Sequence, residues 1–447
     1  SAGNPSPDAF PVEAIAQITA KVLRENPVGV LQYSLTEGYP PLREALKTWM
    51  DTRCHALREF DDLVVVAGAQ QGIDLICKTF CNEGDVILCE DPSFIGSLNC
   101  FRSYGAKLKG IPMDGDGIDL ALLEEALKTT PNVKLLYLIP NFQNPTGITM
   151  SLEKRKAVYS LAKQYGALIL EDNPYGDLRY EGEDVPTLKS MDEDGIVLYC
   201  GSFSKVLSPG LRVGYVLAHK DIIPKITVGK QCTDVHTNIL AQHICERYMA
   251  EYDLPAHIED LRVLYRKKRD LMLDSLAKYL HPAVTFTHPQ GGLFIWCTLP
   301  DGVDMMAYAA EAIKRGVAVV PGTAFLADES ASSQSFRVNF STPSEEAIVK
   351  GCKILGNEQS TGGNCYGTTT HSSPAGAQET DFFWNPAHRR HDLGQLFGGG
   401  AQLGPAAGGL RLHLLHCEHA RHHRPARAGK ASQKHSGRLR LDAGLRY

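Results

Sequence analysis

The residues best suited to chemistry lie in a turn that follows an apolar, strand-like run at 196–200. Ser202 and Ser204 come just before Lys205, and Arg212 follows the lysine by seven residues. Hydroxyl and guanidinium donors bind phosphate, and a lysine amine beside them can form a Schiff base with an aldehyde. The combination indicates pyridoxal phosphate. The alternative is a solvated loop with an incidental Lys and Arg. It is less favoured, because the whole run as far as Arg212 would seldom occur by chance.

Regular strands and helices must position this turn. Apolar runs alternate with helical patterns, with strands expected at 63–66, 86–89, 107–112, 133–139, 167–170, 196–200 and 213–217 and helices at 73–80, 120–127 and 152–165, the last with Ser151 as its N-cap. This alternation predicts an α/β fold with a mostly parallel seven-stranded sheet and helices on both faces. The candidate residues follow strand ends, where such sheets bind ligands.

A different pattern follows residue 217. Helices are expected at 236–250, 258–280 and 305–314, and strands at 284–286, 293–296, 317–320 and 335–340. Thr342-Pro343-Ser344-Glu345 is typical of a capping box with Pro at the first helical position, and the helix that it opens should end at Gly356. We therefore expect a smaller α+β C-terminal domain.

The chain divides into four parts on this pattern. We expect an N-terminal segment at 1–32 that packs on the small domain, a large cofactor-binding domain at 33–250, the small domain at 251–356 and a low-complexity, disordered tail at 357–447. Histidines in the tail, with Cys417 among them, match no tetrahedral metal site, and we predict no metal.

Composition excludes several classes of protein. A net charge of −5 gives no case for nucleic-acid binding, and no apolar run approaches the roughly 20 residues of a membrane span. The twelve cysteines are scattered singly, which favours reduced thiols and a cytoplasmic location.

Between Tyr33 and Gly356 the sequence resembles a fold-type-I pyridoxal-phosphate aminotransferase, in the branch of the 2-aminoadipate and kynurenine aminotransferases and the aminotransferase-like domains of MocR-type regulators. Six segments carry the resemblance: the run from Gln32 to Arg43, Gly68-Ala69-Gln70-Gln71, Asn144-Pro145-Thr146-Gly147, Asp172-Asn173-Pro174-Tyr175, Ser202-Phe203-Ser204-Lys205 with Arg212, and Phe336-Arg337. Their joint presence and order make the resemblance specific.

The resemblance implies roles for three catalytic residues. Lys205 would form the Schiff base and then move a proton. Asp172 would pair with the pyridine nitrogen and keep it protonated, although a turn-capping role is the alternative. Tyr175 and Asn144 would hydrogen-bond the phenolic oxygen of the ring. Asn-Pro-Thr-Gly is also an ordinary turn sequence.

The resemblance also implies the remaining contacts to the cofactor. Six residues would bind the phosphate, through backbone N–H groups at a helix N-terminus or through side chains: Gly68, Ala69, Gln70, Ser202, Ser204 and Arg212. Many relatives have Ser in place of Ala69, so one side-chain donor is lost. Phe94 would stack on the ring, and a core aromatic is an equally good interpretation of it.

Substrate contacts follow from the same resemblance. Arg337 would grip an α-carboxylate through two parallel hydrogen bonds, next to Asn144. Gly3 resembles the small residue of a loop over the substrate. Tyr33 resembles a residue that reaches the phosphate of the neighbouring subunit, which implies a homodimer with shared active sites.

The predicted function is that of an aminotransferase (EC 2.6.1 type), which moves an amino group between an L-amino acid (2-aminoadipate-like, aromatic or branched-chain) and a 2-oxo acid. Two alternatives stay open. A lyase could use the same cofactor. The effector-binding domain of a MocR-type regulator would need a basic winged-helix segment of roughly 70 residues upstream, which this sequence does not contain.

Overall fold

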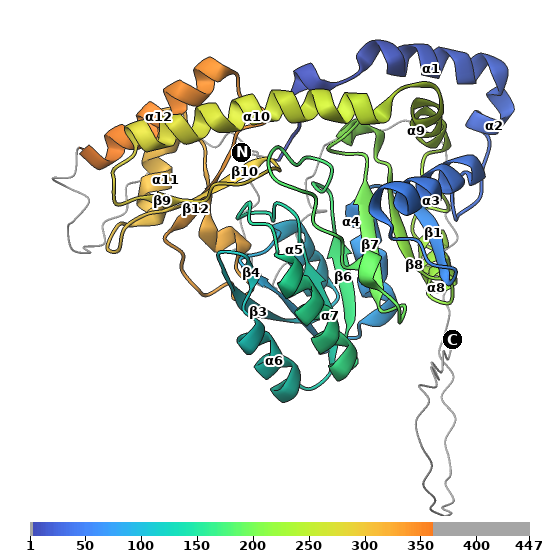
Figure 1. The fold of residues 1–447 in the computed structure, drawn as a ribbon, viewed down its shortest axis with the longest axis horizontal. Coiled ribbons are helices and arrows are strands. Elements are labelled where there is room, and N and C mark those ends of the chain that lie inside the picture. The colour runs from blue at the N-terminus through green and yellow to red at the C-terminus, as the bar shows by residue number, and fades with distance from the viewer. Residues whose placement is uncertain (1–2, 361–447) are drawn as a thin grey trace, which may run out of the picture. The chain divides into compact units, whose positions relative to one another are not determined.

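The computed structural model describes residues 3–360, with side chains described as far as Gly356 (Figure 1). These residues lie within one compact unit. The last helix, α12, runs to Ser360, four residues beyond its predicted end. The rest of the predicted tail, 361–447, lies outside the described residues.

An eight-stranded sheet forms the centre of the large domain. Its order is β1-β8-β7-β6-β5-β2-β3-β4. The strands are β1 Asp61–Val66, β2 Val86–Asp91, β3 Lys107–Asp114, β4 Gly117–Ile118, β5 Val133–Leu138, β6 Leu168–Asp172, β7 Val197–Ser202 and β8 Gly214–His219. Pairing is parallel from β3 through β2, β5 and β6 to β7, whereas β8 is antiparallel to both of its neighbours. The mostly parallel sheet is confirmed, and the two-residue β4 extends the predicted seven strands to eight.

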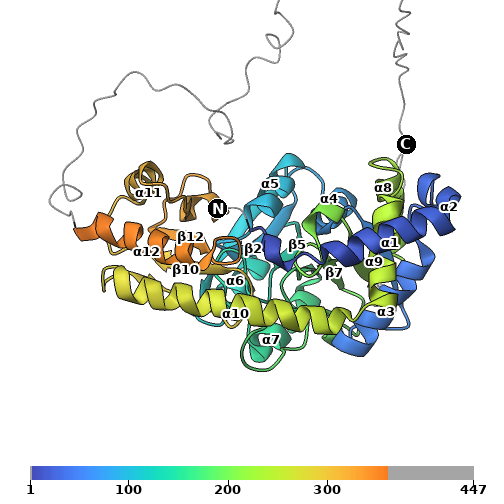
Figure 2. The same cartoon turned by 90° about the horizontal axis from the view of Figure 1, so that it is seen from above.

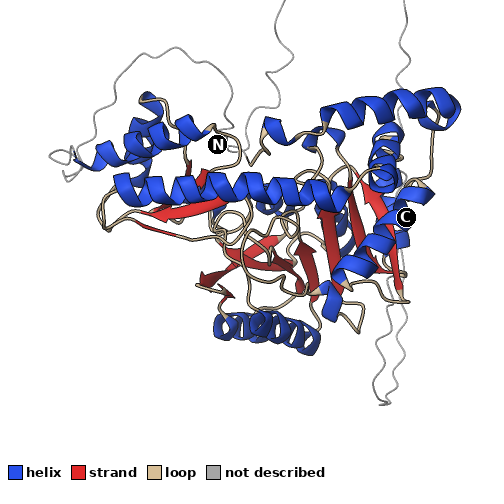
Figure 3. Ribbon diagram, turned by 45° about the horizontal axis from the view of Figure 1, so that its top comes forward, coloured by secondary structure: helices blue, strands red, loops and turns tan. Residues whose placement is uncertain are grey.

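Helices cover both faces of this sheet, as Figure 3 shows. The helices of the large domain are α1 Val12–Glu25, α2 Pro27–Leu31, α3 Pro40–Cys54, α4 Ala69–Phe80, α5 Ile95–Ser103, α6 Leu120–Thr129, α7 Leu152–Tyr165, α8 Ile223–Gln231 and α9 Ile239–Glu251. Successive side chains of a strand point to opposite faces. Thus Leu136 and Leu138 join a core with α6 and α7, while Leu135 and Tyr137 join the core that contains α4 and α5.

A second, antiparallel sheet forms the small domain. Its order is β11-β12-β10-β9, with β9 Thr285–Phe286, β10 Phe294–Thr298, β11 Val320–Pro321 and β12 Ser335–Asn339. The helices are α10 Leu254–Tyr279, α11 Met305–Lys314 and α12 Glu345–Ser360. Figures 1 and 2 show α10 running from beside α9 to the small sheet. The predicted smaller α+β domain is confirmed.

Two local predictions differ from the structure. The strand expected at 317–320 shrinks to Val320–Pro321, because the N–H of Val317 donates to the carbonyl of Ala312 in the turn that ends α11 and is not available to a strand. The cap of α12 is Ser344, whose Oγ accepts from the N–H of Ala347. Thr342, the predicted cap, instead donates its hydroxyl to the carbonyl of Asn4.

The N-terminal segment contacts two regions. Asn4 accepts a second hydroxyl bond from Ser341, and the N–H of Ser6 donates to Tyr265 Oη, while α1 packs against α9. The four-part division of the chain stays a prediction. None of the helices described between residues 3 and 360 is long and apolar enough to cross a membrane.

Candidate active site

Polar residues gather where the parallel strands of the large sheet end. β1 leads into the turn at Gly68, β5 into the turn at Asn144, β6 ends at Asp172, and β7 ends at Ser202, three residues before Lys205. Four strands of one sheet thus bring the sequence-predicted residues to the same edge, where open α/β sheets bind ligands.

The Lys205 amine is partly buried beside the N-terminal segment. Its Nζ donates to the carbonyl oxygen of Gly3 at 2.7 Å. Burial, with the charges of Arg212 and Arg337, lowers the pKa of Lys205 to about 8, and Asp172 opposes the shift. A Cβ on Gly3 would lie 2.6 Å from the ring of Phe294, so a small residue is required there.

Asp172 has one satisfied and one unsatisfied carboxylate oxygen. Oδ2 accepts the hydroxyl of Tyr137 at 2.8 Å, and Tyr137 in turn accepts from Ser97 at 2.8 Å. Oδ1 is buried without a hydrogen-bond partner among the described residues. Burial raises the pKa of Asp172 to about 7, against the opposing effects of Tyr137 and Lys205. A protonated pyridine nitrogen would donate to Oδ1 and favour the ionised carboxylate. The surroundings of Asp172 therefore fit the ring of pyridoxal phosphate.

The predicted phosphate loop surrounds the start of α4. Gly68, at φ +81°, precedes the helix, and its N-terminal end has no side-chain cap. Arg212 donates from Nη2 to the carbonyl of Ala67 at 3.0 Å. A Cβ on Gly68 would lie only 2.2 Å from that same Nη2, and its φ of +81° is one that other residues rarely adopt. Uncapped N–H groups beside a guanidinium can bind phosphate.

Four further predicted phosphate or ring residues lie around this loop. The hydroxyl of Ser202 lies 2.8 Å from that of Ser204. Gln70 donates from Nε2 to the carbonyl of Gly96 at 3.1 Å. A Cβ on Gly96 would lie within 3.0 Å of both the Phe94 ring and Gln70 Oε1, so the ring of Phe94 borders the loop.

Arg337 and Asn144 form a joint between the two sheets. Arg337, on β12, donates from Nη1 to Asn144 Oδ1 at 2.6 Å. Its guanidinium carbon lies 4.1 Å from the ring centre of Phe294 and 4.9 Å from that of Phe325. Burial lowers the pKa of Arg337 to about 10, and Tyr175 opposes the shift. The guanidinium therefore stays charged at neutral pH.

Tyr175 and Tyr33 have contrasting environments. Tyr175 is buried, and burial raises its pKa against the opposing effects of Arg337 and Asn144. Tyr33 is 80% exposed, and its ring contacts that of His236. The chain by itself therefore brings together the predicted site residues other than Tyr33.

Sequence reasoning missed Tyr137, Phe294 and Phe325. Tyr137 carried a signal, since it is the one hydroxyl-bearing residue in the buried apolar run 133–139. The sequence gives no such signal for the two phenylalanines, because a ring that faces a guanidinium and a ring that fills a core look alike in an apolar strand or loop.

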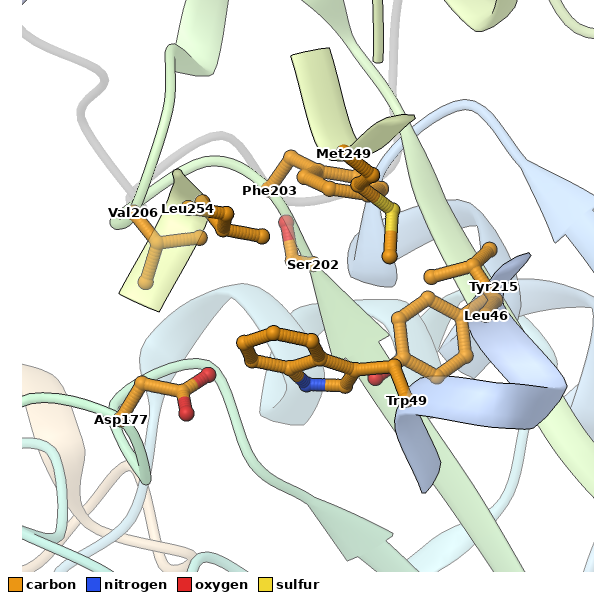
Figure 4. Close-up of a pocket in the computed structure, with 9 residues that line it drawn as sticks. All are labelled: Leu46, Trp49, Asp177, Ser202, Phe203, Val206, Tyr215, Met249 and Leu254. Atoms are coloured by element: carbon orange, nitrogen blue, oxygen red, sulfur yellow. The ribbon is translucent and has the colours of Figure 1, made fainter. Parts of the chain in front are cut away.

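A small cavity is lined in part by the residues on both sides of Lys205, and it shares only Ser202 with the predicted site residues. Trp49, Ser202, Phe203 and Tyr215 are among its lining residues (Figure 4). Its volume of about 20 Å³ suits about one water molecule, too little for a substrate. Residues 3–360 contain no cluster of three or more His, Cys, Asp or Glu side chains that could hold a metal ion.

Comparisons with known proteins point to one family. The family model "Aminotransferase class I and II" matches residues 1–355. The aromatic-amino-acid aminotransferase 1 of Thermococcus litoralis is 42% identical over 357 residues, 79% of this chain and 85% of that protein. The 2-aminoadipate transaminase of Thermus thermophilus is 36% identical, over 79% and 88%. The kynurenine aminotransferase structure from Pyrococcus horikoshii superposes with a TM-score of 0.78 at 38% identity, covering 81% of this chain and 90% of the other.

Proposed function

The chain belongs to the class I and II aminotransferases, and from this premise we propose that it is a transaminase of broad specificity for aromatic amino acids and 2-aminoadipate. Family membership implies pyridoxal phosphate as cofactor. The observation that carries the proposal is the charged guanidinium of Arg337, held by Asn144 between two phenylalanine rings. An α-carboxylate would bind this guanidinium, and an aromatic side chain would find apolar neighbours beside it.

The residues around the cofactor would divide the work. When bound, pyridoxal phosphate supplies an aldehyde that takes up the amino group and a ring that draws electrons from the substrate Cα. Lys205, whose amine is neutral above a pKa of about 8, would take the proton from the substrate Cα. Asp172 would hold a proton at the ring nitrogen through Oδ1, and Tyr137 would keep that carboxylate in place.

Phosphate binding would rest on the loop around Gly68. The N–H groups of Ala69 and Gln70 at the start of α4, the hydroxyls of Ser202 and Ser204, and the Arg212 guanidinium would bind the phosphate. Phe94 would stack on one face of the ring.

We also propose a homodimer in which Tyr33 reaches the phosphate of the partner subunit. Apolar side chains close to Tyr33 in the sequence are exposed: Val28 and Leu31 on α2 are each 73% exposed and Leu35 is 55% exposed. A partner that covers these side chains would remove them from water. Sedimentation of the holoenzyme tests this; a monomer that transaminates at full rate would contradict it. The described part of the chain contains only free cysteines, which supports a cytoplasmic location.

One experiment tests the function. The purified protein would be mixed with pyridoxal phosphate and then with phenylalanine, tyrosine, kynurenine, 2-aminoadipate or leucine, while the absorbance of the bound cofactor is followed. We expect the band to shift with the aromatic amino acids, kynurenine and 2-aminoadipate, and a 2-oxo acid to reverse it. Lys205→Ala is the control and should lack the band of lysine-bound cofactor. No shift with any amino acid would contradict the proposal.

A further inference from the structure

Gln143, immediately before Asn144, is fully buried and uses its whole side-chain amide. Its Nε2 donates to the carbonyl of Pro92 at 2.8 Å and, at 3.4 Å, to Glu90 Oε2. Its Oε1 accepts both the N–H and the hydroxyl of Thr146, at 2.9 and 2.7 Å. A buried amide with two donors and two acceptor positions all engaged fixes the backbone on both sides of it.

The same residue also closes the turn that carries Asn144. Its N–H donates to the carbonyl of Ile148 at 2.8 Å, and its carbonyl accepts from Gly147 at 2.6 Å. The orientation of the Asn144 side chain therefore depends on Gln143, because the two are adjacent and the turn has little freedom.

A second path of contacts leads from Gln143 to Arg337, which donates to Asn144 and with it forms the carboxylate clamp. Pro92, which accepts from Gln143, precedes Ser93, and the N–H of Ser93 donates to the carbonyl of Phe325 at 2.7 Å. The Phe325 ring in turn faces the Arg337 guanidinium.

The two paths meet, because Arg337 donates to Asn144. The contacts thus form a closed ring. Gln143 is joined on one side to Asn144, which accepts from the guanidinium, and on the other side to the segment that leads to Phe325, whose ring faces the guanidinium. Each member restrains the next, so the position of the guanidinium depends on the amide.

We propose that Gln143 is a positioning residue that sets the substrate-carboxylate clamp, acting through Asn144 and through the segment from Pro92 to Phe325. Its hydrogen bonds within the described residues go to Glu90, Pro92 and the turn at 146–148, and none goes to Arg337. The inference rests on the proposed function, because it takes Arg337 as the carboxylate-binding residue.

Gln143→Met tests the proposal, since methionine has nearly the same length and no amide. The probes are 3-phenylpropionate and adipate, the deaminated analogues of phenylalanine and 2-aminoadipate, titrated into the holoenzyme and followed by cofactor absorbance. We expect the substitution to weaken whichever probe the unsubstituted protein binds by about tenfold, equivalent to about 1.4 kcal/mol. The KM for the parent amino acid should rise likewise. The affinity for pyridoxal phosphate should fall by a smaller factor than the affinity for the probe, because the loop around Gly68 would bind its phosphate and Asn144 would contact only its ring oxygen.

Gln242→Met is the matched control. Gln242 is also fully buried, accepts from the N–H of Tyr39 at 2.7 Å and donates to the carbonyl of Thr237 at 2.8 Å. Gln242→Met should lower the free energy of unfolding without weakening the binding of either probe. Thr146→Val keeps the shape and removes the hydroxyl that donates to Gln143 and accepts, at 3.3 Å, from the N–H of Ile148. It should weaken probe binding by roughly threefold, and it gives the answer if Gln143→Met does not fold.

Three outcomes would overturn the inference. One is unchanged probe affinity in both Gln143→Met and Thr146→Val, or in Thr146→Val alone if Gln143→Met does not fold. Another is an equal loss of affinity in Gln242→Met. The last is that the unsubstituted protein binds neither probe, which would also contradict the proposed substrate class; a protein that binds a probe but is insensitive to Gln143 would contradict this inference alone.

Discussion

Replacing Arg337 by lysine separates the charge of the clamp from its shape. Lysine keeps a positive charge but cannot form two parallel bonds to a carboxylate or lie flat between two rings. Arg337 is held by a 2.6 Å bond to Asn144 and by ring faces at 4.1 and 4.9 Å, so the fork is already oriented before a substrate binds. A hydrogen bond to a charged group is worth about 1.5–3 kcal/mol. The loss of one such bond predicts a KM that is roughly 10 to 150 times higher for the best amino acid.

The assay is steady-state transamination with the amino acid varied at a saturating 2-oxo acid. We expect kcat to fall by less than KM rises, because the carboxylate is held equally before and during the proton transfer. Arg269→Lys is the matched control: Arg269 is also buried, lies 5.7 Å from the ring centre of Tyr180, and pairs with Glu181, which is not one of the predicted site residues. An unchanged KM in Arg337→Lys, or an equal rise in Arg269→Lys, would refute the reasoning.

Three further predictions follow from buried charges. Raising the pH should speed the attachment of pyridoxal phosphate to the apoprotein until the rate levels off above about 8, because the Lys205 amine attacks only after losing its proton; a stopped-flow rate that is flat across this pKa would be inconsistent with it. Asp172→Asn should retain the cofactor but lower kcat by about a hundredfold, and a kcat within a few-fold of normal would remove the assigned role. Lys189→Met should lower the free energy of unfolding by about 3–5 kcal/mol, because it leaves two fully buried aspartates without their cation. Urea titration measures this, with the exposed Lys128→Met as a control that should leave the free energy of unfolding nearly unchanged.

The fold and much of the site were predictable because both depend on short-range pattern. The helix expected at 152–165 has those bounds, and Ser151 accepts the N–H of Lys154 as its cap. Strands that share a direction place their ends at one edge, so residues that follow several such strands meet without any knowledge of packing. Asp172 and Lys205 both follow such strand ends, although the residues of its own turn indicated Lys205 and the family resemblance gave Asp172 its role.

Residues whose surroundings come from distant parts of the chain were not predictable. Thr342 looked like a helix cap, but Asn4, 338 residues away, takes its hydroxyl. The neighbours of Gln143 come from another strand end, and the sequence shows them only as Glu90 and Pro92 in an unrelated run. Local sequence propensity cannot show which of several partners a polar side chain will bind when that choice is decided by tertiary contacts.

The turn at 141–147 shows why such contacts matter for function. Thr287, beside the small sheet, donates its hydroxyl to the carbonyl of Thr146 at 2.8 Å, and a Cβ on Gly147 would lie 2.8 Å from the carbonyl oxygen of Phe294. The turn therefore packs directly against the small domain, while Gln143 fastens it to the large sheet. Because Arg337 comes from the small sheet and its acceptor from this turn, the grip on a carboxylate depends on how well the turn joins the two sheets. A residue that carries no chemistry can thus decide how tightly the substrate is held.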